Sequence, residues 1–111
     1  MIRIEEQKHK CLMTVEDEMT IYNASELQAK IFPLLSDPRE LEIDLENVSE
    51  IDSAGVQLLM LARKDRAERG QVLTLTKHSS AVLDVFELMD LLAYFKDPVI
   101  LPGVKGDKRG N

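Results

Sequence analysis

The chain has 111 residues, of which 44% are hydrophobic and 31% charged, and its formal net charge is −6 at pH 7. This length and balance are typical of one compact domain, and no apolar run approaches the roughly 20 residues that a membrane-spanning helix needs. The acidic charge argues against direct nucleic-acid binding, and the single cysteine, Cys11, excludes an internal disulfide and favours the reducing cytoplasm.

The N-terminal residues predict two β-strands. These strands are expected at residues 2–6 and 11–20. Cys11, Met13 and Val15 alternate with Leu12, Thr14 and Glu16, a period of two with weak contrast. The acidic residues 16–18 are expected to end or bend the second strand at the surface.

A first helix is predicted to begin after Asn23. Asn23 followed by Glu26 fits a capping box, in which Asn accepts from the helix start and Glu reaches back. Pro33 removes one helical hydrogen bond and clashes with the preceding turn. The helix is therefore expected to kink or break near Phe32.

The strictest alternation in the chain comes next, at residues 41–46, and it predicts a strand. A helix from about Ser53 to Arg69 follows, and Gly70 suits the left-handed position after a helix end. The basic side chains of the last turns are expected to lie in solvent: Arg63, Lys64, Arg66 and Arg69.

Three more elements are predicted in the C-terminal part. Residues 71–76 have the apolar and β-branched content of a buried strand. Ser79 or Ser80 is expected to cap a third helix, and residues 99–101 could form a last short strand.

The predicted order of elements is β-β-α-β-α-β-α-β, which implies an α/β fold. Strands that alternate with helices favour a mixed β-sheet with parallel crossovers and the helices packed on it. One domain is expected over residues 1–101, followed by a flexible C-terminal tail at residues 102–111.

The helix predicted after Ser53 has more apolar surface than one face of a sheet can bury. Between Ala54 and Ala62 only Gln57 is polar, and at ~100° per residue these positions cover the whole helix circumference. Either neighbouring helices cover the surplus, or part of it is exposed beside Ser53 as a docking patch. The side chains available for such a patch are Val56, Leu58, Leu59 and Met60.

Ser53 itself has two interpretations. Serine is a preferred N-cap residue, so its hydroxyl could simply accept a hydrogen bond from the first turn. Alternatively it accepts a phosphate, because the N–H groups at a helix start lack partners and the helix dipole is positive there. A phosphoserine would add about −1.5 to −2 charges and, inside an apolar contact, would disrupt binding.

No catalytic residue, metal site or cofactor is expected. Asp44 and Asp52 could be read as paired carboxylates, but acid–base catalysis also needs a positioned nucleophile or electrophile, and none accompanies them. Asp44, expected at a strand end beside Ser53, is interpreted as a loop-ordering acceptor or a kinase contact. His9 and Cys11 lack the further ligands that a zinc site needs.

Residues 45–56, Leu-Glu-Asn-Val-Ser-Glu-Ile-Asp-Ser-Ala-Gly-Val, with Asp44 before them, resemble the STAS domain of anti-sigma factor antagonists. The length and element order agree with that family up to about Leu101. In this family the serine at the helix start is phosphorylated by a partner that is both a serine kinase and an anti-sigma factor. The unphosphorylated form binds that partner and frees the sigma factor, and a metal-dependent serine phosphatase restores it.

The resemblance implies a cytoplasmic bacterial regulator of transcription that is not an enzyme. Ser53 matches the phosphoacceptor, and Asp52 matches the acidic residue before it. An alternative is a non-catalytic STAS adaptor subunit in a chemotaxis, phosphorelay or lipid-transport assembly, where Ser53 is only a cap. No oligomeric state is predicted. The residues expected to contact the partner are Asp44, Asp52, Ala54, Gly55, Val56, Leu59 and Met60.

Overall fold

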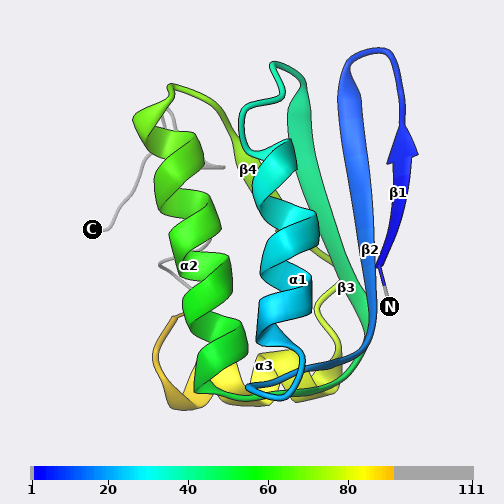
Figure 1. Cartoon of the computed structure of the whole chain (residues 1–111). Coiled ribbons are helices and arrows are strands. Elements are labelled where there is room, and N and C mark those ends of the chain that lie inside the picture. The colour runs from blue at the N-terminus through cyan, green and yellow to red at the C-terminus, as the bar shows by residue number, and fades with distance from the viewer. Residues whose placement is uncertain (1, 92–111) are drawn as a thin grey trace.

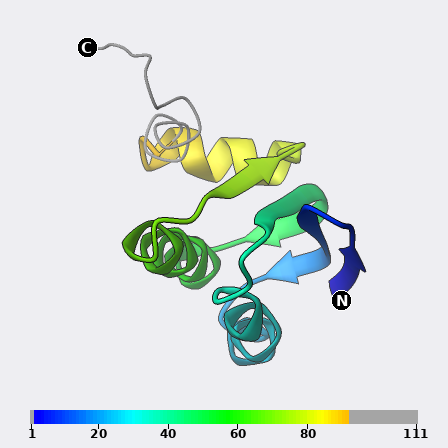
Figure 2. The same cartoon turned by 90° about the horizontal axis from the view of Figure 1, so that it is seen from above.

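A computed structural model describes residues 2–91 and shows a four-stranded sheet between helices (Figures 1 and 2). The strand predicted at residues 99–101, the domain boundary after residue 101 and the flexible tail lie outside these residues. Within them the predicted order is confirmed. The elements are β1 (Ile2–Glu6), β2 (Lys10–Met19), α1 (Ala24–Ile31), the 3-10 turn η1 (Phe32–Leu34), β3 (Glu40–Ile51), α2 (Ser53–Glu68), β4 (Leu73–Thr76) and α3 (Ser80–Leu88).

The sheet is mixed, with the strand order β1-β2-β3-β4. β1 is antiparallel to β2, whereas β2, β3 and β4 are parallel to one another. Figure 2 shows α1 and α2 side by side on one face and α3 on the other. Because β2 and β3 are parallel, their carboxyl ends lie at the same end of the sheet, and the β2–α1 loop and the start of α2 both follow from there.

The core lies between the sheet and the two crossover helices. Alternate residues of β2 and β3 are buried on the face that α1 and α2 cover, as the alternation at residues 41–46 predicts. The main contributors are Cys11, Met13, Val15, Leu41, Ile43, Leu45, Leu27, Ile31, Leu59 and Ala62.

The two ends of α1 differ in how well the sequence predicted them. The break before Pro33 is confirmed, because α1 ends at Ile31 and continues only as the short turn η1. The prediction of a capping box at the other end is wrong, because the Asn23 side chain makes no hydrogen bond to the first turn of α1. The side-chain oxygen of Asn23 accepts from the Thr20 N–H at 2.8 Å, and its amide group donates to the Glu18 carbonyl, so it orders the loop before the helix.

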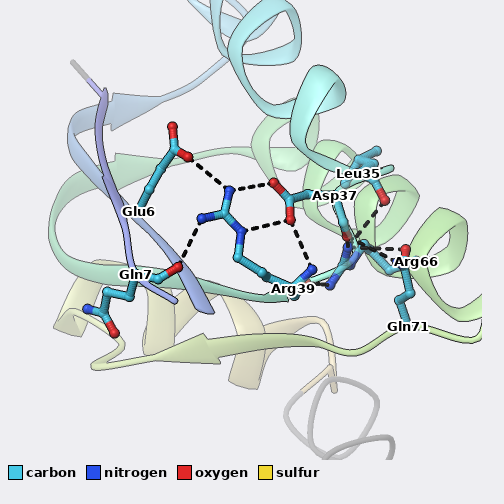
Figure 3. Close-up of polar contacts among 7 residues, drawn as sticks. All are labelled: Glu6, Gln7, Leu35, Asp37, Arg39, Arg66 and Gln71. Carbon is cyan, nitrogen blue, oxygen red and sulfur yellow. Dashed lines mark hydrogen bonds and ion pairs between the residues drawn. The ribbon is translucent and has the colours of Figure 1, made fainter. Parts of the chain in front are cut away.

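The prediction that Arg66 lies in solvent is also wrong, because its side chain is only 1% exposed. Its guanidinium donates to four backbone carbonyls and to the Gln71 side chain. Figure 3 shows these bonds except those to Val72. Burial lowers the Arg66 pKa from its ordinary value. The accepting carbonyls belong to Leu35, Asp37, Arg39 and Val72.

Arg39 joins the same end of the fold to the β1–β2 hairpin (Figure 3). It donates to both carboxylate oxygens of Asp37 at 3.0 and 2.7 Å, to the Glu6 carboxylate at 2.9 Å and to the Gln7 carbonyl at 2.9 Å. These charge-assisted bonds hold the pKa of Asp37 well below its ordinary value and raise the pKa of Arg39. The network therefore anchors the loop that leads into β3.

Candidate functional site

The candidate site lies where β2 and β3 end and α2 begins. The last pair between the two strands is Met19 with Ile51. Directly after it, the Asp52 N–H donates to the Met19 carbonyl at 3.2 Å. In Figure 1 the β2–α1 connection runs beside the first turn of α2 at the lower edge of the molecule. Segments that are distant in sequence are thus brought together around Ser53.

Asp52 supplies the N-cap of α2. Its Oδ1 accepts from the Ala54 N–H at 2.9 Å and the Gly55 N–H at 3.2 Å, while its Oδ2 accepts from the Ile21 N–H at 3.0 Å. These N–H donors favour the charged carboxylate and therefore lower the pKa of Asp52, and the bond from Ile21 makes the largest contribution. One side chain therefore closes the helix start and fastens the neighbouring loop to it.

Ser53 is the first residue of α2 and is exposed to solvent. The interpretation of Ser53 as a plain N-cap is wrong, since Asp52 occupies that position. Within residues 2–91 the Ser53 hydroxyl makes no hydrogen bond in the structure. Phosphorylation of Ser53 stays a prediction, and the site leaves its oxygen accessible to another enzyme.

Gly55 allows α2 to begin this close to β2. It is buried, and a Cβ built on it would overlap the Met19 carbonyl oxygen and lie 2.9 Å from Cγ1 of Ile51. Any side chain here would push the helix start away from the strand end. The contact of Gly55 with a partner stays a prediction, whereas its packing role follows from the contact with Met19.

The docking patch predicted on the first turns of α2 is not on the surface. Val56, Leu58 and Leu59 are 1%, 5% and 0% exposed, so most of the surplus apolar surface is covered, and Leu61, at 50%, is the exposed apolar side chain of this stretch. Val56 and Leu59 are therefore not on the surface in this conformation, and their contact with a partner stays a prediction. Met60 is half-buried and packs against the core, and Ala54 is half-buried at the first turn.

Exposed apolar side chains do lie at the site, but on the β2–α1 loop. Ile21 is 69% exposed and Tyr22 is 90% exposed. The sequence pattern assigned no role to this pair, although two large apolar residues between a strand end and a helix start are an available signal. The Asp52–Ile21 bond, which joins residues 31 apart, holds them beside the start of α2, in addition to the backbone bond from the Asp52 N–H to the Met19 carbonyl.

Asp44 does not belong to this cluster. It lies inside β3, opposite Thr14 and Thr76, and not at a strand end beside Ser53. Its Oδ1 accepts from the Glu46 N–H at 2.9 Å where the pairing with β2 shifts register, and Lys77 lies 3.8 Å away. Asp44 thus orders a strand irregularity, and the structure does not pair it with Asp52 as an acid–base couple.

The surroundings of Ser53 are acidic. The segments 17–26 and 50–56 contain no Lys or Arg. Within residues 2–91 no group of three or more His, Cys, Asp or Glu side chains could hold a metal ion, and no helix combines the length and apolar character needed to span a bilayer. The carboxylates of the two segments are Asp17, Glu18, Glu26, Glu50 and Asp52.

Comparison with known proteins places these features in a family. The sequence model described as "Mlab, STAS domain" matches residues 2–99. An anti-sigma factor antagonist from Mycobacterium paratuberculosis is 20% identical with a TM-score of 0.77, over 94% of this chain and 86% of that one. The Bacillus cell fate determinant SpoIIAA, in its phosphorylated form, is 16% identical with a TM-score of 0.66, over 99% and 93%.

The anti-sigma factor antagonist SpoIIAA in its unphosphorylated form has the same fold. It is 18% identical with a TM-score of 0.64, and the match covers 79% of this chain and 83% of that one. At these identities the likeness to solved structures shows a common fold.

Proposed function

This chain belongs to the Mlab STAS domain family, and from the sequence around Ser53 and the fold that it shares with anti-sigma factor antagonists we propose that it is such an antagonist, switched by phosphorylation of Ser53. It is not an enzyme but the substrate of one. In the bacterial cytoplasm the unphosphorylated form binds a partner that is both a serine kinase and an anti-sigma factor. Phosphorylation ends that binding, and a serine phosphatase restores it.

The observation that carries this proposal is the division of labour between Asp52 and Ser53. Asp52 caps α2 with hydrogen bonds to Ala54 and Gly55, so the exposed Ser53 hydroxyl has no structural task to lose on modification. The solved relatives add support, because SpoIIAA is known in unphosphorylated and phosphorylated forms that both share this fold.

The chemistry of the switch needs only ATP and the partner's catalytic groups. The Ser53 oxygen attacks the γ-phosphorus of ATP, its proton passes to a base of the kinase, and ADP leaves. The product adds about −1.5 to −2 charges beside two segments, 17–26 and 50–56, that already contain five carboxylates. A partner surface that is complementary in charge to this end of the unmodified protein is basic. The phosphate also repels the nearest carboxylate of this chain, that of Asp52.

The test is phosphorylation of the full chain by the serine kinase encoded nearest to its gene, with ATP and site mapping by mass spectrometry. The expected result is one phosphate on Ser53 and none in Ser53→Ala. Phosphate on another serine, or none at all, contradicts the proposal. The competing acceptors to be mapped are Ser25, Ser36, Ser49, Ser79 and Ser80.

A permanent adaptor role is the second candidate, and a different surface favours it. A shallow groove on the later half of α2 is lined by Phe32, Leu61, Lys64, Asp65 and Glu68, and Leu61 is 50% exposed. A partner held there has no dependence on Ser53. Equal copurification of one partner with wild type and Ser53→Asp, together with its loss in Leu61→Asp, supports the adaptor role.

A further inference from the structure

We infer that Asp52 relays the phosphorylation state of Ser53 to the β2–α1 loop, so that phosphate releases Ile21 and Tyr22 from their place beside α2. This inference rests on the proposed phosphorylation of Ser53. It adds a mechanical consequence to the charge itself. Asp52 is a positioning residue in this mechanism, because it acts through the loop and touches no reacting atom.

The start of α2 offers a limited number of hydrogen-bond donors. A helix has few free N–H groups at this end, and they are the groups that bind a phosphate. Asp52 already takes two of them, from Ala54 and Gly55, with Oδ1. A phosphate on Ser53 therefore competes with the Asp52 carboxylate for the same donors.

Charge decides the outcome of that competition. Ser53 and Asp52 are consecutive, with Cα atoms about 3.8 Å apart. A phosphate of about −1.5 to −2 charges repels the adjacent carboxylate and binds the positive helix start more strongly than a single carboxylate does. The Asp52 side chain is thereby turned away from the N–H groups of α2, and its second oxygen moves with it.

The second oxygen is the link to the loop. Oδ2 of Asp52 accepts from the Ile21 N–H at 3.0 Å, which is the side-chain bond that fastens the middle of this loop to α2. Four other bonds order the loop internally. The Thr20 N–H donates to the Asn23 side chain and the Asn23 side-chain amide to the Glu18 carbonyl, while the Tyr22 N–H donates to the Thr20 hydroxyl and the Asn23 N–H to the Thr20 carbonyl. Those bonds are untouched by phosphate, so the loop changes position without unfolding.

The surface that moves is one that a kinase acting on Ser53 must cover. Ile21 and Tyr22 are 69% and 90% exposed and lie on the loop that Asp52 holds against the first turn of α2. The segments around them, 17–26 and 50–56, contain carboxylates and no cation. The occupant is therefore the kinase of the proposed function, through a basic surface with an apolar recess for Tyr22.

The test needs no partner. Phosphoserine is incorporated genetically at position 53 of the full chain, and backbone amide exchange is measured by NMR. The Ile21 amide is expected to exchange at least about tenfold faster than in wild type, because it loses a charged acceptor. Ser53→Ala keeps the wild-type rate, and Asp52→Asn is expected to exchange faster without any phosphate.

The matched control places the same charge at the other end of β3. Ser36 is exposed and precedes that strand, whereas Ser53 follows it. Phosphoserine at position 36 is expected to leave the Ile21 amide unchanged. An Ile21 rate that stays at the wild-type value with phosphoserine at 53 overturns the relay, and so does an equal rise with phosphoserine at 36.

The docking surface has its own test with the kinase. Tyr22→Ala is expected to lower kcat/KM for phosphorylation of Ser53 about tenfold, while Val72→Ala, an exposed apolar residue beside the start of β3 and away from the site, keeps it. Equal values for Tyr22→Ala and wild type overturn this docking surface. If no kinase modifies Ser53, the proposed function fails, and the amide measurement still decides whether Asp52 couples the two segments.

Discussion

Replacing Arg66 by alanine is expected to destabilise the fold strongly. The guanidinium makes six hydrogen bonds of 2.7 to 3.3 Å, five of them to backbone carbonyls that no longer have this donor after the change. The side chain is also one of the largest fully buried ones, so its removal leaves a cavity. A buried acceptor without a partner costs about 1–3 kcal/mol.

These contributions are not additive, because water can enter the space and satisfy some of the carbonyls. We therefore expect Arg66→Ala to lower the free energy of unfolding by about 2–5 kcal/mol, from carbonyls left without a donor and from the cavity. Typical domains have only about 5–15 kcal/mol in total. Arg66→Lys keeps the charge but not the planar fork, so its loss is expected to be intermediate.

The assay is urea denaturation at 25 °C followed by far-UV circular dichroism, which suits a chain without tryptophan. Lys64→Ala, on the exposed side of the same helix, is the control and is expected within about 0.5 kcal/mol of wild type. A loss below about 1 kcal/mol for Arg66→Ala would refute the reasoning. If that variant does not fold, Arg66→Lys still gives a graded value.

Two further predictions concern single groups. Gly55→Ala is expected to lower the free energy of unfolding by about 1–3 kcal/mol, because its Cβ overlaps the Met19 carbonyl. Gly70→Ala, at φ 72 with open space around it, is expected to lose about 1 kcal/mol. Urea denaturation measures both, and a larger loss for Gly70→Ala than for Gly55→Ala contradicts this reasoning. The folded-state pKa of Asp37 is depressed by Arg39, so this group stabilises the fold above its unfolded pKa of about 3.9, and that contribution is lost as pH falls through the folded pKa. Between about pH 5 and about pH 2, the free energy of unfolding of Asp37→Asn is therefore expected to fall less than that of wild type. Parallel curves of unfolding free energy against pH would contradict this role of Asp37.

Local patterns predicted the elements well. The alternation at residues 41–46 marks β3, Pro33 marks the end of α1, and Gly70 adopts φ 72 after α2 as expected. Each of these depends on neighbours in sequence, so a single chain contains the information. The alternation of strands with helices also predicted the mixed sheet with parallel crossovers, which brings two distant loops together where β2 and β3 end.

Apart from the capping box at Asn23, whose side chain bonds residues three and five positions before it, the main errors lie where a side chain acts over a long sequence distance. The Asp52–Ile21 bond joins residues 31 apart, and nothing in the local pattern around either residue indicates it. Arg66 follows Leu59 and Ala62 on the buried stripe of α2, a signal that the positive charge concealed. Its carbonyl partners come from the loop before β3, which only the folded chain brings near.

The position of the two polar networks along β3 has a consequence for how such proteins diversify. Arg39 and Arg66 hold the segment that enters this strand, whereas Asp52 and Ser53 follow the residue where it ends. A substitution at Ile21 or next to Ser53 that changes which partner binds there therefore leaves the arginine network intact. New partner specificities can accumulate at one pole of the domain while its capacity to fold is kept at the other.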